Sequence, residues 1–126
     1  MGIAYAATND LNNADAQREI FQMTLEHVPK SRLDSQNRIV DVLKVASSML
    51  NGEIEYRKQN YDFSFFPIRE AIKHEENLTY IEPWGWMLPA RHPCGAISHN
   101  FNAHTRKTEK TLAVSEDDFR ADCWLI

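Results

Sequence analysis

Apolar residues in the first part of the chain recur at the spacing of an α-helix. From Asn12 to Val28 they return every three or four residues, the period of one helical face. Asn12 or Asn13 is a suitable N-cap, and Pro29 ends the helix because it lacks an N–H and pushes Val28 out of the helical region. Together with the small apolar residues before it, the segment 2–28 is predicted to be a helical hairpin.

A second and longer hairpin is predicted between residues 34 and 76. Its first helix begins at Asp34 or Ser35 and continues to about Gln59, with an apolar stripe wide enough to contact neighbours on two sides. Gly52 costs this helix about 1 kcal/mol relative to alanine. We therefore expect another backbone to approach closely at Gly52.

The second helix of this hairpin is expected to be capped by Asp62 or Ser64. Pro67 then lies within about the first turn, where proline is tolerated. Ala71 is predicted to lie where the two helices touch, and Glu75 on the face turned to solvent.

The character of the chain changes after this hairpin. Three prolines and two tryptophans predict an ordered loop over 77–93, the periodicity of 94–104 is ambiguous, and the polar segment 105–122 is expected to be poorly packed or disordered. The predicted fold class is all-α, as tandem antiparallel helical hairpins with little or no sheet. We predict a helical repeat module over 1–97 and a divergent, flexible tail over 98–126.

Composition narrows the class of protein. A chain of 126 residues and 14.6 kDa fits one domain. No stretch approaches the roughly 18–20 apolar residues that cross a bilayer. The N-terminus has no basic leader, and two cysteines cannot form a disulfide framework. A net charge of -4 disfavours nucleic acid as a partner. A small, acidic, cytoplasmic protein is expected.

The two hairpins show self-similarity. A shift of 48 residues aligns Ala4 with Gly52, Ala16 with Ser64, Ile20 with Ile68 and Met23 with Ala71. The small, aromatic and apolar positions of the second copy are Gly52, Tyr61, Ser64, Ile68 and Ala71. This spacing resembles the tetratricopeptide repeat (TPR), in which small residues let paired helices approach closely. The resemblance implies an α-solenoid of stacked hairpins, with helices longer than those of the usual repeat of about 34 residues.

The segment that follows strengthens the resemblance. The sequence Pro83-Trp84-Gly85-Trp86, followed by Pro89-Ala90-Arg91-His92, is similar to the C-terminal part of longer TPR proteins of bacteria and fungi. Cys94-Gly95-Ala96-Ile97 looks like the start of a further helix. The resemblance covers residues 2–97.

Such repeats bind other proteins, so the resemblance implies a non-catalytic scaffold or interaction module. Stacked hairpins form a groove that holds a peptide or a helix. Asn51, Glu55 and Lys58 are the residues expected to face that groove from the first helix of the second hairpin. The alternative is an accessory protein of a metabolic pathway, which binds a small molecule or a pathway enzyme near the Trp84–His92 loop.

Self-association is a further expectation. About three repeats are usually needed for a stable array, and this chain has about two. Val42, Val45 and Met49 widen the apolar stripe of the long helix, and we expect them to remain partly uncovered in a monomer. A partner or a second copy would then cover them.

Two interpretations are open for Trp84, Trp86, Arg91 and His92. They are either an aromatic recognition surface, with Arg91 pairing a partner carboxylate, or a structural cover over the end of the second hairpin. The side chains that such a cover would shield are Phe65, Phe66 and Ile72.

Other candidate chemistry is weak. His92, His99, His104, Cys94 and Cys123 lack the paired spacing of a zinc site, and no catalytic motif is present, so neither metal, cofactor nor enzyme activity is expected. Asn77-Leu78-Thr79 is a glycosylation sequon that needs a secretory route. Cys123 occupies the prenylation position of a C-terminal Cys-a-a-X sequence, but the acidic residues just before it disfavour a membrane anchor.

Overall fold

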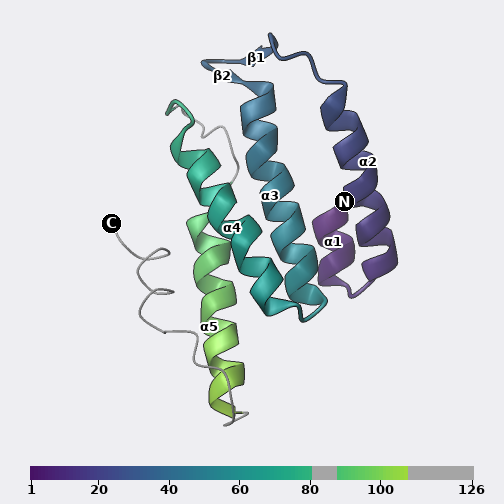
Figure 1. Ribbon diagram of the computed structural model, residues 1–126, viewed down its shortest axis with the longest axis vertical. Helices are drawn as coiled ribbons and strands as arrows, with labels where there is room; N and C mark the ends of the chain where they lie inside the picture. The colour runs from purple at the N-terminus through teal and green to yellow at the C-terminus, as the bar shows by residue number, and fades with distance from the viewer. Residues whose placement is uncertain (81–87, 108–126) are drawn as a thin grey trace.

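Helices make up most of the chain that the structure describes. The computed structural model describes residues 1–80 and 88–107. Its helices are α1 (Gly2–Ala7), α2 (Leu11–Glu26), α3 (Ile39–Arg57), α4 (Tyr61–Glu76) and α5 (Arg91–Lys107), and its strands are β1 (Leu33–Asp34) and β2 (Asn37–Arg38) (Figure 1). The prediction of a mostly helical chain with little sheet is confirmed.

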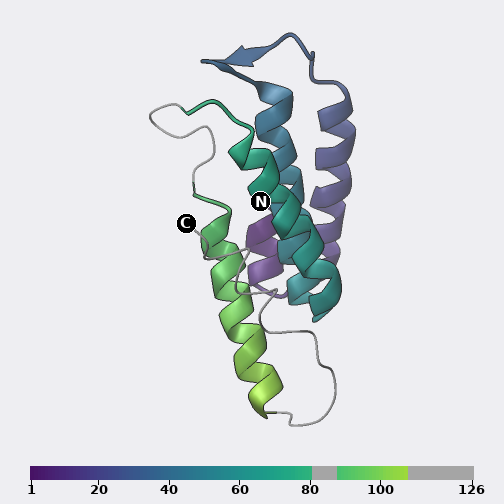
Figure 2. The same cartoon turned by 60° about the vertical axis from the view of Figure 1, so that its left-hand side comes forward.

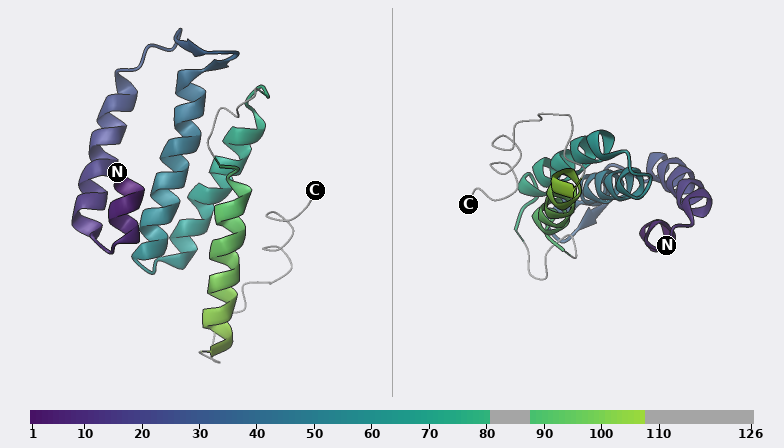
Figure 3. Two further views of the ribbon diagram at one scale, coloured as in Figure 1. Left: turned by 180° about the vertical axis from the view of Figure 1, so that it is seen from behind. Right: turned by 90° about the horizontal axis from the view of Figure 1, so that it is seen from below.

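The four long helices lie side by side in chain order, from α2 to α5. α3 packs between α2 and α4, and α5 packs against α4 on the side away from α2 (Figure 2). The short α1 contacts both α2 and α3 (Figure 3). The antiparallel β1–β2 pair connects α2 to α3 at one end of the molecule.

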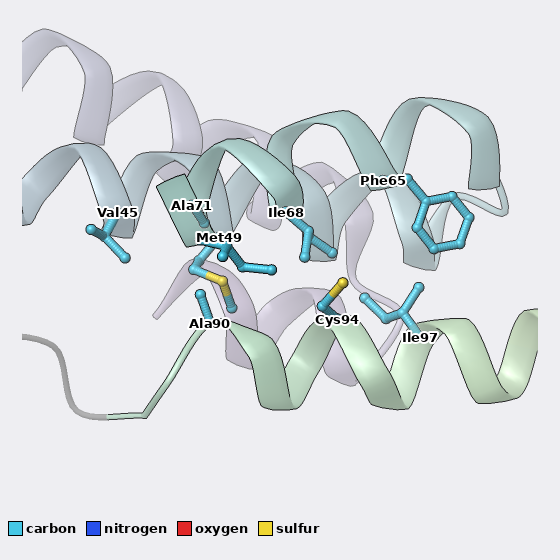
Figure 4. Close-up of a cluster of buried hydrophobic side chains, with 9 residues drawn as sticks. Val45, Met49, Phe65, Ile68, Ala71, Ala90, Cys94 and Ile97 are labelled. Atoms are coloured by element: carbon cyan, nitrogen blue, oxygen red, sulfur yellow. The ribbon is translucent and has the colours of Figure 1, made fainter. Parts of the chain in front are cut away.

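α3 is the centre of the fold because it contributes to two separate apolar clusters. One face joins α4 and α5 in a cluster of Val45, Met49, Phe65, Ile68, Ala71, Ile72, Ala90, Cys94 and Ile97 (Figure 4). The other face joins α1 and α2 in a cluster of Ala6, Ala14, Leu50 and Ile54. The prediction that this helix contacts neighbours on two sides is therefore confirmed.

The uncovered stripe expected on α3 is not observed. Val45 is 0% and Met49 6% exposed, because Ala90, Cys94 and Ile97 cover them from the α5 side. The sequence left this part of the chain ambiguous, and the helix that forms there supplies the missing cover. Val42, the third residue of the stripe, is half-buried, the expected uncovered surface is absent at Val45 and Met49, and self-association stays a prediction.

The start of α2 is earlier than predicted. The side chain of Asp10 accepts hydrogen bonds from the backbone N of Asn13 at 3.3 Å and from its Nδ2 at 2.7 Å. Asp10 is therefore the N-cap, and Asn12 and Asn13 lie within the first turn. Asn9 just before it adopts a positive φ of 63°, which asparagine tolerates better than most residues.

The start of α3 is later than predicted. Asp34 and Ser35 do not cap it, because Asp34 pairs with Asn37 in the β1–β2 ladder and Ser35 turns the chain with a φ of 56°. Asn37 then fixes this hairpin to the end of α4: its Nδ2 donates to the Thr79 carbonyl at 2.8 Å and its Oδ1 accepts from the Thr79 N at 2.7 Å. The hairpin displaces the first turn of the predicted helix.

Pro67 lies deeper in α4 than predicted. α4 begins at Tyr61 with Asn60 as N-cap, so Pro67 is in the second turn rather than the first. It offers no N–H to the carbonyl of Phe63, one turn earlier. The exposed position of Phe63 lets water satisfy that carbonyl.

The small residues of the second hairpin behave as its spacing predicts. A Cβ on Gly52 would lie 2.3 Å from Ile68 Cγ1 and 3.1 Å from the Ser64 carbonyl oxygen, so α3 and α4 are in close contact there. The aligned positions of the first hairpin differ: Ala4, Ala16, Ile20 and Met23 are all exposed. The two copies therefore do not pack equivalently.

Two features of the C-terminal part bear on the predicted division of the chain. α5 continues through residues 97 and 98, so the described part of the 98–126 segment is helical. The remainder, 108–126, lies outside the described residues. Within the parts of the chain that the structure describes, no helix has the length and apolar character of a membrane span.

Glu75 is not on a solvent-facing surface, contrary to expectation. Its Oε2 accepts a hydrogen bond from the backbone N of Ala90 at 2.8 Å, directly before α5. The neighbouring Glu76 forms an ion pair with Arg91 in the first turn of that helix. These two carboxylates attach the start of α5 to the end of α4. The N-terminus of α5 carries the positive end of the helix dipole, so acidic groups beside it are favourable.

Replacing Glu75 with alanine is therefore expected to destabilise the fold by about 1 kcal/mol, through loss of this cap-like hydrogen bond. Glu26→Ala is the matched control, because Glu26 is exposed at the end of α2. Urea denaturation followed by circular dichroism measures both variants. Equal midpoints for the two would contradict the role of Glu75.

Candidate functional site

A groove lies between α2 and α4 in the part of the chain that the structure describes. It has a volume of about 900 Å³, and α3 forms its floor. The lining residues are Arg18, Glu19, Gln22 and Met23 from α2, Asn51 and Glu55 from α3, and Phe63, Phe66 and Pro67 from α4. We call it the α2–α4 groove.

One side of the groove is apolar and open to solvent. Phe63 is 73% and Phe66 69% exposed, and Met23 is 58% exposed on the facing helix. The two phenylalanines are three residues apart, so they lie on the same face of α4. Phe65 between them is buried in the core. Large apolar side chains gathered on one exposed surface are typical of an interaction site.

The other side carries a network of charges that joins α2 to α3. Arg18 bonds Asp15 at 2.7 Å and Glu55 at 3.1 Å. Lys58 bonds the same two carboxylates at 3.0 and 3.4 Å. Asn60 Nδ2 donates to Glu55 Oε2 at 2.9 Å. Two cations thus bridge two carboxylates, and the first hairpin is fixed to the second.

Opposing effects act on the pKa of Glu55. Burial raises the pKa, whereas hydrogen bonds from Asn60 and Arg18 and the charge of Lys58 lower it, and the net pKa lies below the usual value of 4.5. The folded state therefore stabilises the ionised carboxylate.

This shift predicts a pH-dependent effect of Glu55→Gln. The substitution is expected to lower the free energy of unfolding by about 1–2 kcal/mol at pH 7, because a neutral amide replaces the charged carboxylate that accepts these hydrogen bonds. Since the folded-state pKa is depressed, the stabilisation is present above about pH 4.5 and is lost as the pH falls through the folded-state pKa. Denaturation of wild type and variant at a series of pH values measures it. A difference that stays constant down to about pH 3 would contradict the prediction.

The three groove residues predicted from the sequence have different positions. Asn51 and Glu55 line the α2–α4 groove, whereas Lys58 belongs to the charge network and is not among the lining residues. The sequence does not predict the apolar wall of the groove, which is formed by Phe63, Phe66 and Met23. Its only signal was the Phe63-Ser64-Phe65-Phe66 run, which holds more aromatic residues than one helical face can bury.

The predicted Trp84–His92 surface is only partly within the described residues. Trp84, Trp86 and Cys123 lie outside them. Arg91 pairs with Glu76 of its own chain at the C-terminal end of α4, and His92 is exposed. The α2–α4 groove is at the N-terminal half of α4, so the structure does not bring Arg91 and His92 together with Asn51 and Glu55.

The chemistry of the groove suits binding. Exposed aromatic side chains supply apolar contact area, and a carboxylate network holds a fixed charge pattern beside them. In the described ranges, no group of three or more side chains is placed to hold a metal ion. A comparison with models of protein families, with curated proteins and with solved structures finds no match to this chain.

Proposed function

We propose that the chain is a non-catalytic interaction module that takes apolar side chains of another protein into the α2–α4 groove. The observation that carries the proposal is the pair of exposed phenylalanines, Phe63 and Phe66, facing Met23 across a groove of about 900 Å³. Aromatic residues in such positions commonly contribute most of the affinity at protein interfaces.

The TPR resemblance supports a scaffold role of this kind in the cytoplasm. The repeat positions of the second hairpin, from Gly52 to Ala71, lie in the tight α3–α4 contact that such repeats use. The α2–α4 groove, however, is flanked by the second helix of each hairpin. The proposed binding surface therefore differs from the groove that the repeat pattern implies.

The test is selection of helical peptides from a displayed library, followed by mapping of the bound peptide through NMR chemical shifts. Phe63→Ser combined with Phe66→Ser is expected to weaken binding at least about tenfold, since each aromatic anchor is worth about 1–2 kcal/mol. Stability should change by less than about 0.5 kcal/mol per site, because both side chains are exposed.

Leu33→Ser is the matched control, because Leu33 is an exposed apolar residue outside the groove. It should leave binding unchanged. Shifts that map outside α2, α3 and α4, or equal binding by the double variant, would refute the proposal.

A further inference from the structure

The charges beside the apolar wall point to the chemistry of the partner. Resting on the proposed function, we propose that the α2–α4 groove binds an amphipathic helix that carries a lysine or arginine beside its apolar face, and that Glu19 pairs with this cation.

A helix fits this groove better than an extended peptide does. The walls and floor come from three helices, and apart from the first turn of α4 and the Phe63 carbonyl, their backbone groups in the groove are bonded within each helix. An extended peptide gains affinity from a sheet edge, and among the described residues the strands are the two-residue β1 and β2, at the opposite end of α3. A helix satisfies its own backbone and can place apolar residues i and i+4 against Phe63 and Phe66.

The unbalanced charge in the groove is negative. Asp15, Arg18, Glu55 and Lys58 neutralise one another in the network. The side chain of Glu19 has no ion pair or hydrogen bond within the described residues. It lies one turn before Met23 on the same face of α2, so its carboxylate is beside the apolar wall. A cation on the flank of a bound helix would find its partner there.

The same charges disfavour two other occupants. A second copy that used the same face would bring its own Glu19 to the interface, and two chains that each have a net charge of -4 repel each other. An anionic membrane surface would meet the same repulsion. A basic partner instead gains from attraction at long range, which accelerates association.

The experiment uses two synthetic peptides of about 18 residues, a length at which isolated helices become appreciably populated. Both carry leucines along one helical face, with lysines flanking that face in one peptide and glutamates in the other. Fluorescence anisotropy measures their binding to the full chain. We expect the lysine peptide to bind about three- to tenfold more tightly than the glutamate peptide, with a preference that weakens as salt is raised.

Two charge-reversal variants on α2 distinguish a direct contact with Glu19 from an effect of the net charge of the protein on peptide binding. Glu19→Lys is expected to remove or reverse the preference. Glu26→Lys changes the net charge equally at an exposed site outside the groove and should retain it. If Glu19→Lys keeps the preference, or both variants lose it equally, the assignment of a basic partner to Glu19 is overturned.

Failure of the underlying function gives a different result. If neither peptide binds wild type, or both bind the Phe63→Ser/Phe66→Ser double variant as tightly, the groove is not a helix-binding site at all. If sedimentation instead shows a dimer that the double variant dissolves and the peptides do not displace, the occupant is a second copy and the inference is overturned.

Discussion

Ala71→Arg is expected to destabilise the fold by about 4 kcal/mol or more. Ala71 is 0% exposed and lies in the cluster shared by α3, α4 and α5. An arginine there must either bury its charge without a partner or push the helices apart. The total stability of a domain is only about 5–15 kcal/mol, so the variant could lose much of its folded population.

The measurement is urea denaturation followed by far-UV circular dichroism. Lys73→Arg is the matched control, because it places the same side chain on the exposed face of α4 and can keep the ion pair with Glu70. It should change stability by less than about 0.5 kcal/mol. If Ala71→Arg does not fold, Ala71→Val tests the same contact, with an expected cost of about 1–3 kcal/mol from overpacking. Midpoints equal to that of the control would show that the register of α4 is wrong.

The helices that carry strong apolar periodicity could be predicted from the sequence. Phe65, Ile68, Ala71 and Ile72 define one face of α4, and all four are buried in the structure. The apolar stripe of α3 was wide because the helix packs on both sides. Periodicity is informative here because a helix that contacts several neighbours must repeat its apolar residues at the helical spacing.

The ends of the helices were harder to predict for a local reason. Asp10 and Asn12 can both cap a helix, and the sequence does not say which one turns the chain. At the start of α3, the deciding contact is long-range: the side chain of Asn37 bonds Thr79, which is far away in sequence. Local helix propensity depends only on neighbouring residues, so it does not indicate such a contact.

The groove could be predicted only in part, because exposure depends on which neighbours are missing. Asn51 and Glu55, which the helical spacing predicts to face a groove, line the α2–α4 groove, and their contact with a partner stays a prediction. Phe65 and Phe66 are equally apolar, and only the packing of α3 and α5 determines that Phe65 is buried and Phe66 is not. The role of Glu19 likewise depends on which ion pairs form around it.

Gly52→Ala is expected to destabilise the protein by about 1–3 kcal/mol, although alanine is the better helix former by about 1 kcal/mol. The added Cβ would lie 2.3 Å from Ile68 Cγ1 and 2.9 Å from its Cδ1. Cγ1 is attached directly to the Cβ of Ile68, and this side chain is buried, so the atom has little room to move away. The added methyl group cannot shift in the other direction, because the Ser64 carbonyl oxygen lies there at 3.1 Å. Relief therefore requires α3 and α4 to separate, which disturbs the cluster that α3 and α4 share with α5.

Gly2→Ala is the matched control, because it adds the same methyl group to another buried glycine in a helix. There the closest atom is the terminal Cδ1 of Leu50 at 2.8 Å, which can rotate away. The control should cost less than about 1 kcal/mol, or stabilise through the helix propensity of alanine. Thermal and urea denaturation of both variants separate the two cases. A Gly52→Ala protein at least as stable as wild type would mean that α3 and α4 are not in close contact at this position, and the tight hairpin that supports the α2–α4 groove would have to be abandoned.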